Sequence, residues 1–224
     1  MRVSVLQSNY IPWRGYFDII RRSDVFVFYD DVKFTKNDWR NRNQVKGPNG
    51  PIWLTIPCPK NYSIKINEVQ PTNSEWQEKH WRTITQCYSK SPYFSKYSDF
   101  FEDFYLKHEW CSLSELNQIV IKHVAREIFG FTAQFASSSD FILSGTKESR
   151  LIDLLKQIGT SVYISGPSAK NYINQEHFKS VGIEIEWMDY GHYREYNQQF
   201  PPYNPFVSIV DQIFNVGPGS SFFD

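Results

Sequence analysis

The near-continuous apolar run at residues 25–29 (VFVFY) constrains the fold more than any other segment. Apolar side chains at successive positions are typical of a strand that is covered on both faces, as in a parallel sheet. A strand-like run at residues 2–6 precedes it, and apolar residues at helical spacing follow Gly15. Strand, helix and strand within about thirty residues form a βαβ unit. We therefore predict an α/β, Rossmann-like fold with a mainly parallel sheet, in which Leu6 and Tyr29 end adjacent strands.

The rest of the chain continues this alternation on both sides of a helical block. Further strands are predicted at residues 52–57, 64–69, 131–135, 162–164 and 183–187. Helices are predicted at residues 147–158, after the turn at 165–169, and at 206–214.

The block at about 74–129 has only helical patterns, at residues 74–89, 93–108 and 112–129. Ser112 and Glu115 form a capping box at the start of the third helix. We expect a single domain over residues 1–224, with this block as a helical insertion that covers part of a cleft.

Composition excludes several classes of protein. The 24 basic and 24 acidic residues cancel, which argues against a general nucleic-acid partner. No stretch has the length and apolar purity of a membrane span, and the amino terminus has no signal-peptide pattern, so a cytoplasmic protein is expected. Three scattered cysteines and five scattered histidines lack the spacing of a disulfide framework or a metal site.

The first candidate site lies where the first strand meets the first helix. A loop at this position can direct backbone N–H groups and the positive end of the helix at an anion. Its amides can bond to the edges of a sugar or base, its indole can stack, and its glycine allows close approach. The alternative is a loop that orders itself through its aromatic side chains. The candidate substrate-binding residues are Gln7, Asn9, Trp13, Gly15 and Tyr16.

The second candidate site follows the second strand. Adjacent carboxylates at a strand end, Asp30 and Asp31, are candidate catalytic residues that orient an amine, accept a proton or hold a magnesium ion. Arg42 has a planar fork suited to phosphate, and Asn41 and Asn43 add donors and acceptors for a substrate. The alternative is a charged surface turn.

Two later segments complete the candidate set. Ser165, Gly166 and Ser168 stand between a predicted strand and helix, where small residues form either an anion cradle or an ordinary β–α turn. Asp189 is a candidate substrate-binding residue, and His192 is the preferred catalytic histidine because it follows a strand and lies among polar aromatics.

These loops all leave the carboxyl ends of predicted parallel strands, where ligands bind in open α/β sheets. We therefore predict that seven side chains converge on one cleft: Asn9, Trp13, Asp30, Asp31, Asn41, Arg42 and Ser165.

Six ordered blocks resemble the WbqC-like family in sequence and spacing. They are QSNYIPWRGYFDII, DVFVFYDDVKFTKNDWRNRNQVK, WLTIP, YISGPSAKNYI, IEWMDY and SIVDQIFNVG, and they extend over nearly the whole chain. The resemblance implies a role in the biosynthesis of O-antigen, the polysaccharide part of lipopolysaccharide, or of another surface polysaccharide. It implies modification of an amino sugar, in the form of acylation by an amino acid such as glycine.

On this basis the expected activity is a transferase or ligase that acylates a nucleotide-linked amino sugar. Its partners are that sugar and an acyl or aminoacyl donor, with an aminoacyl-tRNA as one option for the donor. The alternative is a non-catalytic sugar-nucleotide binding protein, or a partner subunit of the same pathway. This alternative is supported by the absence of a nucleophile triad, a metal set and a P-loop from the sequence.

The layout also resembles Rossmann-like nucleotidyltransferases and adenylate-forming enzymes, including pantothenate synthetase. Those enzymes carry an H-x-G-H-type motif after the first strand, whereas this chain has Trp13-Arg14-Gly15-Tyr16 with an aromatic residue at both histidine positions. A cofactor of ATP with magnesium is therefore left open, because the side chains that stabilise phosphate-transfer charge are replaced.

Overall fold

The centre of the protein is a five-stranded parallel sheet. The computed structural model describes residues 1–35, 37–60, 63–219 and 223. The strands are β1 (Arg2–Leu6), β2 (Val25–Phe28), β5 (Gln134–Ser137), β6 (Val162–Ser165) and β7 (Glu184–Trp187). They lie in the order β5-β2-β1-β6-β7, and every pairing within this sheet is parallel. The predicted α/β Rossmann-like fold is confirmed, and the strand order reverses between β1 and β6.

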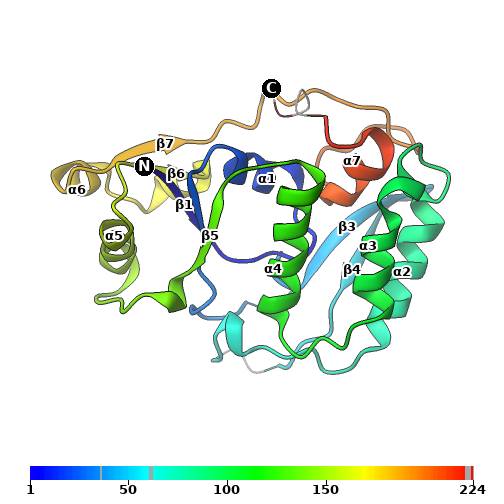
Figure 1. Ribbon diagram of the computed structural model, residues 1–224, viewed down its shortest axis with the longest axis horizontal. Helices are drawn as coiled ribbons and strands as arrows, with labels where there is room; N and C mark the ends of the chain where they lie inside the picture. Colours follow the sequence, from blue (N-terminus) through cyan, green and yellow to red (C-terminus); the bar gives the residue numbers. More distant parts are fainter. Residues whose placement is uncertain (36, 61–62, 220–222, 224) are drawn as a thin grey trace.

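Helices cover both faces of the sheet, which explains the continuous apolar run in β2. Phe26 and Phe28 belong to one core, and Val27 belongs to the core on the opposite face. Helix α1 (Arg14–Arg21) packs in the first core, and α5 (Lys147–Ile158) and α6 (Gln175–Ser180) pack in the second. Figure 1 shows α5 and α6 at the opposite end of the molecule from α2 and α3.

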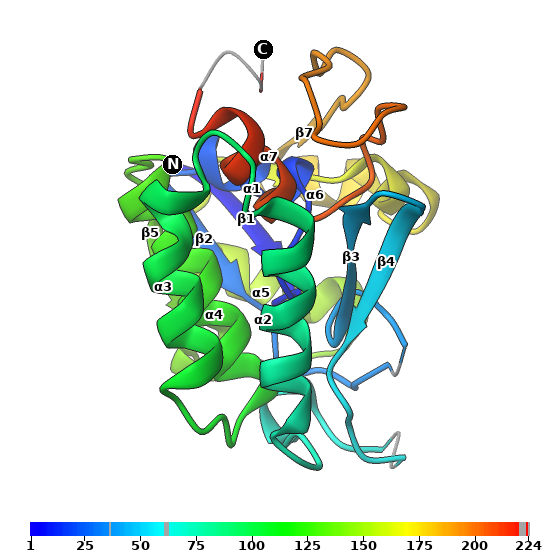
Figure 2. The ribbon, with the colours of Figure 1, turned by 90° about the vertical axis from the view of Figure 1, so that its right-hand side faces the viewer.

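The block at residues 74–129 contains α2 (Glu75–Tyr88), α3 (Phe94–Leu106), α4 (Leu113–His123) and a π-helical turn (Val124–Ile128). The hydroxyl of Ser112 accepts the backbone N–H of Glu115 at 3.2 Å, so the predicted cap is present. Figure 2 shows α2, α3 and α4 side by side on one flank of the sheet.

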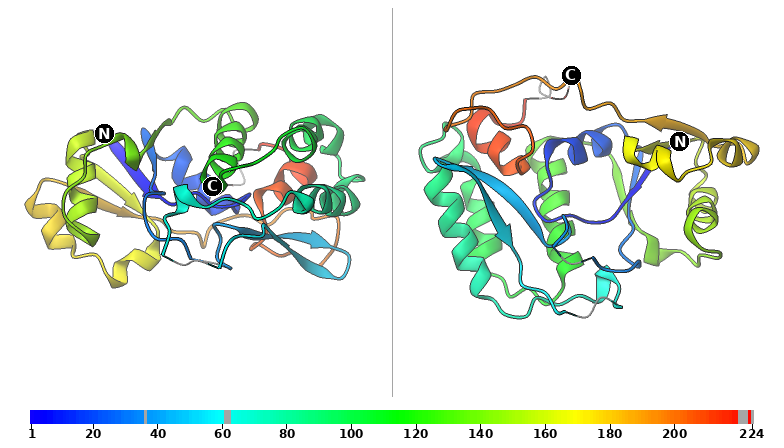
Figure 3. Two further views of the ribbon diagram at one scale, coloured as in Figure 1. Left: turned by 90° about the horizontal axis from the view of Figure 1, so that it is seen from below. Right: turned by 180° about the vertical axis from the view of Figure 1, so that it is seen from behind.

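An antiparallel hairpin, β3 (Arg42–Gly47) and β4 (Gly50–Thr55), lies outside the main sheet. Gly50 turns it with a φ of 110°, a conformation that favours glycine. The right-hand view in Figure 3 shows the hairpin between the helical block and α1.

Local hydrogen bonds shift several elements from their predicted positions. The strand predicted at 64–69 is wrong: Ile66–Glu68 is a 3-10 helix, because the Glu68 carboxylate accepts the Lys65 N–H at 2.9 Å and turns the chain. The strand predicted at 131–135 begins at Gln134, because Phe131 packs against Phe129 instead.

Hydroxyl and amide caps also move two predicted helices. The helix predicted at 206–214 begins later, as α7 (Ile209–Val216), because Ser208 caps it by accepting the Val210 N–H at 3.2 Å. After β6, a 3-10 helix (Pro167–Asn171) is followed by α6, whose cap is Asn174. The residues between, 172–173, are therefore outside both helices.

The segment between β7 and α7, residues 188–208, crosses the molecule from the α6 end of the sheet to the hairpin (Figure 1), and we call it the crossing segment. Its last residue, Ser208, donates its N–H to the Gln44 carbonyl of β3, and Ile209 donates to Pro12. These bonds attach the carboxyl-terminal part of the chain to the loop after β1. Within the described residues, no helix is long and apolar enough to span a membrane.

Candidate functional site

The crevice between the loops after β1 and β6, where Rossmann-like sheets bind ligands, is filled by aromatic side chains of the chain itself. A Cβ atom at Gly15 would collide with the indole of Trp13, so glycine is needed for the indole to lie across the first turn of α1. Tyr190 packs edge-on against Trp13, with ring centroids 5.1 Å apart. A Cβ atom at Gly166 would lie 3.6 Å from the Tyr190 hydroxyl oxygen. The predicted anion cradle at Gly15 and Gly166 is thus lined by these two rings.

A cavity of about 310 Å³ opens beside Trp13, and we call it the aromatic cleft. Its walls come from the loop after β1, the loop before β3, β3 itself and the crossing segment. The lining residues are Asn9, Pro12, Trp13, Trp39, Asn43 and Phe206. Three aromatic rings and two amides make a site suited to a flat ligand with a polar edge.

The two amides of the aromatic cleft have different roles. Asn43 is buried in β3 and its Nδ2 donates to the carbonyls of Tyr10 at 3.1 Å and Ile11 at 2.9 Å. These bonds hold a strained turn, because Ile11 is β-branched and has a φ of 36°. The Oδ1 of Asn9 is buried and has no hydrogen-bond partner among the described residues. Asn43 therefore shapes the aromatic cleft, whereas Asn9 has an acceptor available for a ligand.

An exposed aromatic platform extends the aromatic cleft outward along the hairpin. Trp39 is 45% exposed and Trp53 is 44% exposed, and their ring centroids are 5.9 Å apart. The guanidinium carbon of Arg42 lies 4.3 Å from the centroid of Trp53. Arg42 forms no ion pair with a described residue, so its charge at the rim is available to an anion.

Asp30 has a well-defined structural environment at the end of β2. Its side chain is buried, with the residue 2% exposed, and it accepts the Ser8 N–H at 2.8 Å, the Ser114 hydroxyl, and Nε2 of Gln118 at 3.3 Å. These donors join the loop after β1 to α4. The carboxylate therefore ties the loop after β1, which carries the cleft residue Asn9, to α4, and its catalytic role remains a prediction.

Asp31 faces a different set of partners from Asp30. It forms an ion pair with Arg150 of α5 and accepts the hydroxyl of Ser138, which follows β5. Burial alone raises the pKa of Asp31, but the hydrogen bonds from Arg150 and Ser138 and the Arg150 charge together hold it below its ordinary value. None of these partners lines the aromatic cleft, and the predicted proton transfer by Asp31 remains a prediction.

Three other predicted residues are bonded within the loops that frame the aromatic cleft. Asn41 is buried, accepts the Asn37 N–H at 3.1 Å and donates to the Ile56 carbonyl at 2.9 Å. Gln7 accepts a hydrogen bond from Arg40, and its carbonyl accepts the Tyr16 hydroxyl at 3.0 Å. These groups position the walls of the aromatic cleft.

The predicted residues after β6 and β7 lie apart from the aromatic cleft lining. Ser165 is buried and its hydroxyl lies 3.4 Å from that of Tyr163, whereas Ser168 is exposed. Asp189 is exposed and accepts the Gly191 N–H at 2.9 Å, and the exposed His192 has its Nε2 3.3 Å from the Phe223 carbonyl oxygen.

Of the seven side chains expected to converge, two line the aromatic cleft, Asn9 and Trp13, and Asn43 of the wider candidate set lines it as well. Arg42 is not part of the lining but stacks on Trp53. Pro12, Trp39 and Phe206 were missed as site residues. Phe206 follows an Asn-Pro turn and is 66% exposed, and a large apolar residue after a turn was the available signal.

Comparisons with known proteins extend over almost the full chain. The sequence profile of the WbqC-like protein family matches residues 7–221. The chain is 38% identical over 218 residues to an uncharacterized protein, Rv1507c, of Mycobacterium tuberculosis (strain ATCC 25618 / H37Rv), with 96% of this chain and 94% of that protein covered. No solved structure matches the chain. The chain is therefore a member of the WbqC-like protein family.

Proposed function

We propose that this protein binds a nucleotide-linked amino sugar in the aromatic cleft and acylates its amine, in the biosynthesis of O-antigen or another surface polysaccharide. The observation that carries the proposal is the set of aromatic rings in the cleft together with the unpartnered Oδ1 of Asn9. The cation of Arg42 stacks on Trp53, whose ring centroid lies 5.9 Å from that of the cleft residue Trp39.

The size of the aromatic cleft supports this ligand class. A volume of about 310 Å³ is at the small end for ligand pockets, which suits one ring of a nucleotide sugar. The remainder of the ligand would extend over Trp39 and Trp53, where flat faces allow stacking. Its diphosphate would then reach Arg42, whose planar fork matches phosphate oxygens.

The acylation step requires attack of the sugar amine on an activated carboxyl carbon, with loss of the leaving group and of one amine proton. The Oδ1 of Asn9 is an acceptor that orients the amine. Asp30, Asp31 and His192 are the candidate proton acceptors. The proposal leaves two donors open. The carboxyl group is activated either by ATP with magnesium or on an aminoacyl carrier.

A second candidate function is non-catalytic binding of the same sugar nucleotide, or service as a partner protein of the pathway. The bonding of the two carboxylates favours it, because Asp30 accepts hydrogen bonds from three groups and Asp31 is paired with Arg150.

Isothermal titration with UDP-glucosamine tests the binding half. Stacking on an aromatic ring contributes about 1–3 kcal/mol, so Trp39→Ala should weaken binding by about tenfold. Arg42→Gln should weaken binding of UDP-glucosamine but leave binding of free glucosamine unchanged. Tyr172→Ala is the control, because that ring is 75% exposed and does not line the aromatic cleft. Equal affinity in the wild type and Trp39→Ala would exclude the cleft as the binding site.

Mass spectrometry of the sugar product separates the two candidates. Formation of the N-aminoacyl sugar from UDP-glucosamine, an amino acid, ATP and magnesium supports the transferase or ligase. Saturable binding with no amide product from these reagents or from an aminoacyl-tRNA supports the binding protein.

A further inference from the structure

Arg14 is a buried arginine without an acidic partner. The residue is 4% exposed, and its Nη1 donates to the Arg194 carbonyl at 2.7 Å. Its Nε is buried and has no hydrogen-bond partner, and no carboxylate lies within ion-pair distance among the residues that the structure describes. A buried cation without a counter-charge costs several kcal/mol, so its surroundings indicate what binds it.

Three tyrosines surround the Arg14 guanidinium. Its central carbon lies 4.7 Å from the ring centroid of Tyr193, 5.8 Å from Tyr196 and 5.9 Å from Tyr203. Cation–π contacts contribute about 0.5–2 kcal/mol each, which offsets only part of the cost of burying the charge. The rings also exclude water from the guanidinium, and this strengthens its attraction for any anion that replaces water.

The buried acid nearby, Asp211 of α7, is already bonded to other groups. Its oxygens accept hydrogen bonds from Tyr88 at 2.9 Å, Tyr196 at 2.8 Å and Gln198 at 2.9 Å. Burial raises the pKa of Asp211, against the opposing effect of these hydrogen bonds. Asp211 therefore does not supply the missing partner of Arg14.

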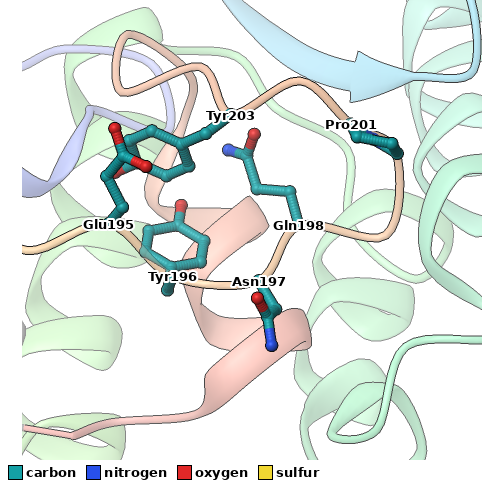
Figure 4. Close-up of a pocket in the computed structure, with 6 residues that line it drawn as sticks. All are labelled: Glu195, Tyr196, Asn197, Gln198, Pro201 and Tyr203. Atoms are coloured by element: carbon teal, nitrogen blue, oxygen red, sulfur yellow. The ribbon is translucent and has the colours of Figure 1, made fainter.

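A cavity of about 230 Å³ lies beside the tyrosines, within the crossing segment. It is lined by Glu195, Tyr196, Asn197, Gln198, Pro201 and Tyr203. Figure 4 shows the Tyr196, Gln198 and Tyr203 side chains directed toward a common space, with Asn197 directed away from it. We call it the Arg14 cavity, because Tyr196 and Tyr203 are shared between its wall and the ring of tyrosines.

Tyr203 is the second unpartnered group at this position. Its hydroxyl is buried and has no hydrogen-bond partner among the described residues. Its ring packs edge-on against Tyr196, with centroids 5.3 Å apart. The Tyr203 ring lines the cavity and also faces the Arg14 guanidinium. A guanidinium with no ion-pair partner and an unbonded Nε, together with an unbonded hydroxyl, form a pair of donors suited to an oxyanion.

A second buried cation adds to the positive charge of this region. Lys46 of β3 is 4% exposed, and its ammonium donates to the Pro202 carbonyl, next to the cavity wall. Glu195 is the one acid in the cavity lining, but it is exposed and its charge is screened by solvent. Two buried acids, Asp18 and Asp211, also contact the crossing segment, where they accept the hydroxyls of Tyr193 and Tyr196. Asp18 is already paired with Arg21 and Arg22, so neither acid is paired with Arg14.

We propose that the Arg14 cavity binds a small oxyanion, the phosphate or carboxylate group of a ligand, with Arg14 as the counter-charge and the Tyr203 hydroxyl as a hydrogen-bond donor. Trp13, the residue before Arg14, lines the aromatic cleft. The oxyanion site does not depend on the proposed function, because it needs neither an amino sugar nor turnover.

Isothermal titration of the full chain with inorganic phosphate and with acetate, at constant ionic strength in chloride, tests the proposal. We expect one of the two anions to bind stoichiometrically, and Tyr203→Phe to weaken that binding by about fivefold or more because it removes one hydrogen bond to a charged ligand. The tighter anion identifies the group as phosphate or carboxylate. Tyr203→Phe removes no hydrogen bond to any residue that the structure describes, so it should fold normally.

Two further variants make the result decisive. Arg14→Gln should abolish binding, and Trp39→Ala should leave phosphate or acetate affinity unchanged, since Trp39 lines only the aromatic cleft. Equal anion affinity in the wild type and Tyr203→Phe, or no binding of either anion to the wild type, would overturn the proposal. Loss of anion binding in Trp39→Ala would overturn it as well, by placing the anion in the aromatic cleft.

Discussion

Acidification should destabilise this protein through His80, a buried residue of α2. Its Nδ1 is 2.8 Å from the Tyr10 hydroxyl, and that hydroxyl also bonds to Tyr105. Burial lowers the pKa of His80 from 6.5 to about 4, despite the opposing hydrogen bond with the Thr55 backbone. The neutral imidazole therefore joins α2 to the loop after β1, where Tyr10 follows the aromatic cleft residue Asn9.

The magnitude follows from the two pKa values of His80. Between pH 6.5 and about 4 the unfolded chain binds a proton at His80 that the folded chain does not bind. The free energy of unfolding therefore falls by about 1.4 kcal/mol per pH unit across this window, and the stabilisation is fully present only above pH 6.5. The loss between pH 7 and pH 5 should be about 2 kcal/mol, a large part of a typical folding free energy.

Urea denaturation at pH 7 and pH 5, at fixed ionic strength, measures this loss. His80→Gln cannot titrate, so its stability should fall by about 2 kcal/mol less than that of the wild type over the same interval. The exposed His108→Gln is the control and should behave as the wild type. An equal fall in the wild type and His80→Gln would show that His80 titrates near its ordinary pKa, and the argument would fail.

Three other changes test the site architecture. Gly15→Ala should displace the Trp13 indole and weaken UDP-glucosamine binding by about tenfold in isothermal titration, because the added Cβ occupies the place of the ring; unchanged affinity would count against a stacking role for Trp13. Asp30→Ala should cost about 3 kcal/mol of unfolding free energy in urea, because it leaves buried donors without an acceptor, and a loss below about 1 kcal/mol would contradict this. Asp31→Asn should abolish amide formation if Asp31 takes the proton, and it should cost about 1 kcal/mol through the weakened bond to Arg150; full turnover in mass spectrometry would remove Asp31 from the mechanism.

The parallel sheet was predictable because burial on both faces leaves a direct mark on the sequence. In β2 the side chains Phe26 and Val27 enter opposite cores, so apolar residues must be adjacent. The hairpin strand β3 was not predictable in the same way. Its sequence, RNQVKG, is mostly polar, and its one large apolar side chain is Val45. Its extended form depends on pairing with β4, which no local pattern reports.

The candidate site was predictable in position but not in bonding. Two of the residues singled out in loops at strand ends, Asn9 and Trp13, line the aromatic cleft. The partners of Asp30 and Asp31 come from α4 and α5, which are 84 and 119 residues away. A sequence reveals that a carboxylate stands at a strand end, but not whether distant donors bind it.

The attachment of the crossing segment to the loop after β1 sets the order in which the protein can mature on the ribosome. Phe206 forms part of the aromatic cleft, and the bonds from Ser208 to Gln44 and from Ile209 to Pro12 close its wall. The nascent chain can pair β1 with β2 early, but the cleft is incomplete until residues 206–209 have left the exit tunnel. Pairing of segments so distant in sequence is also slow. Trp39 and Trp53 are therefore synthesised more than 150 residues before Phe206. Chaperone contact with these two exposed indoles would be most frequent in that interval.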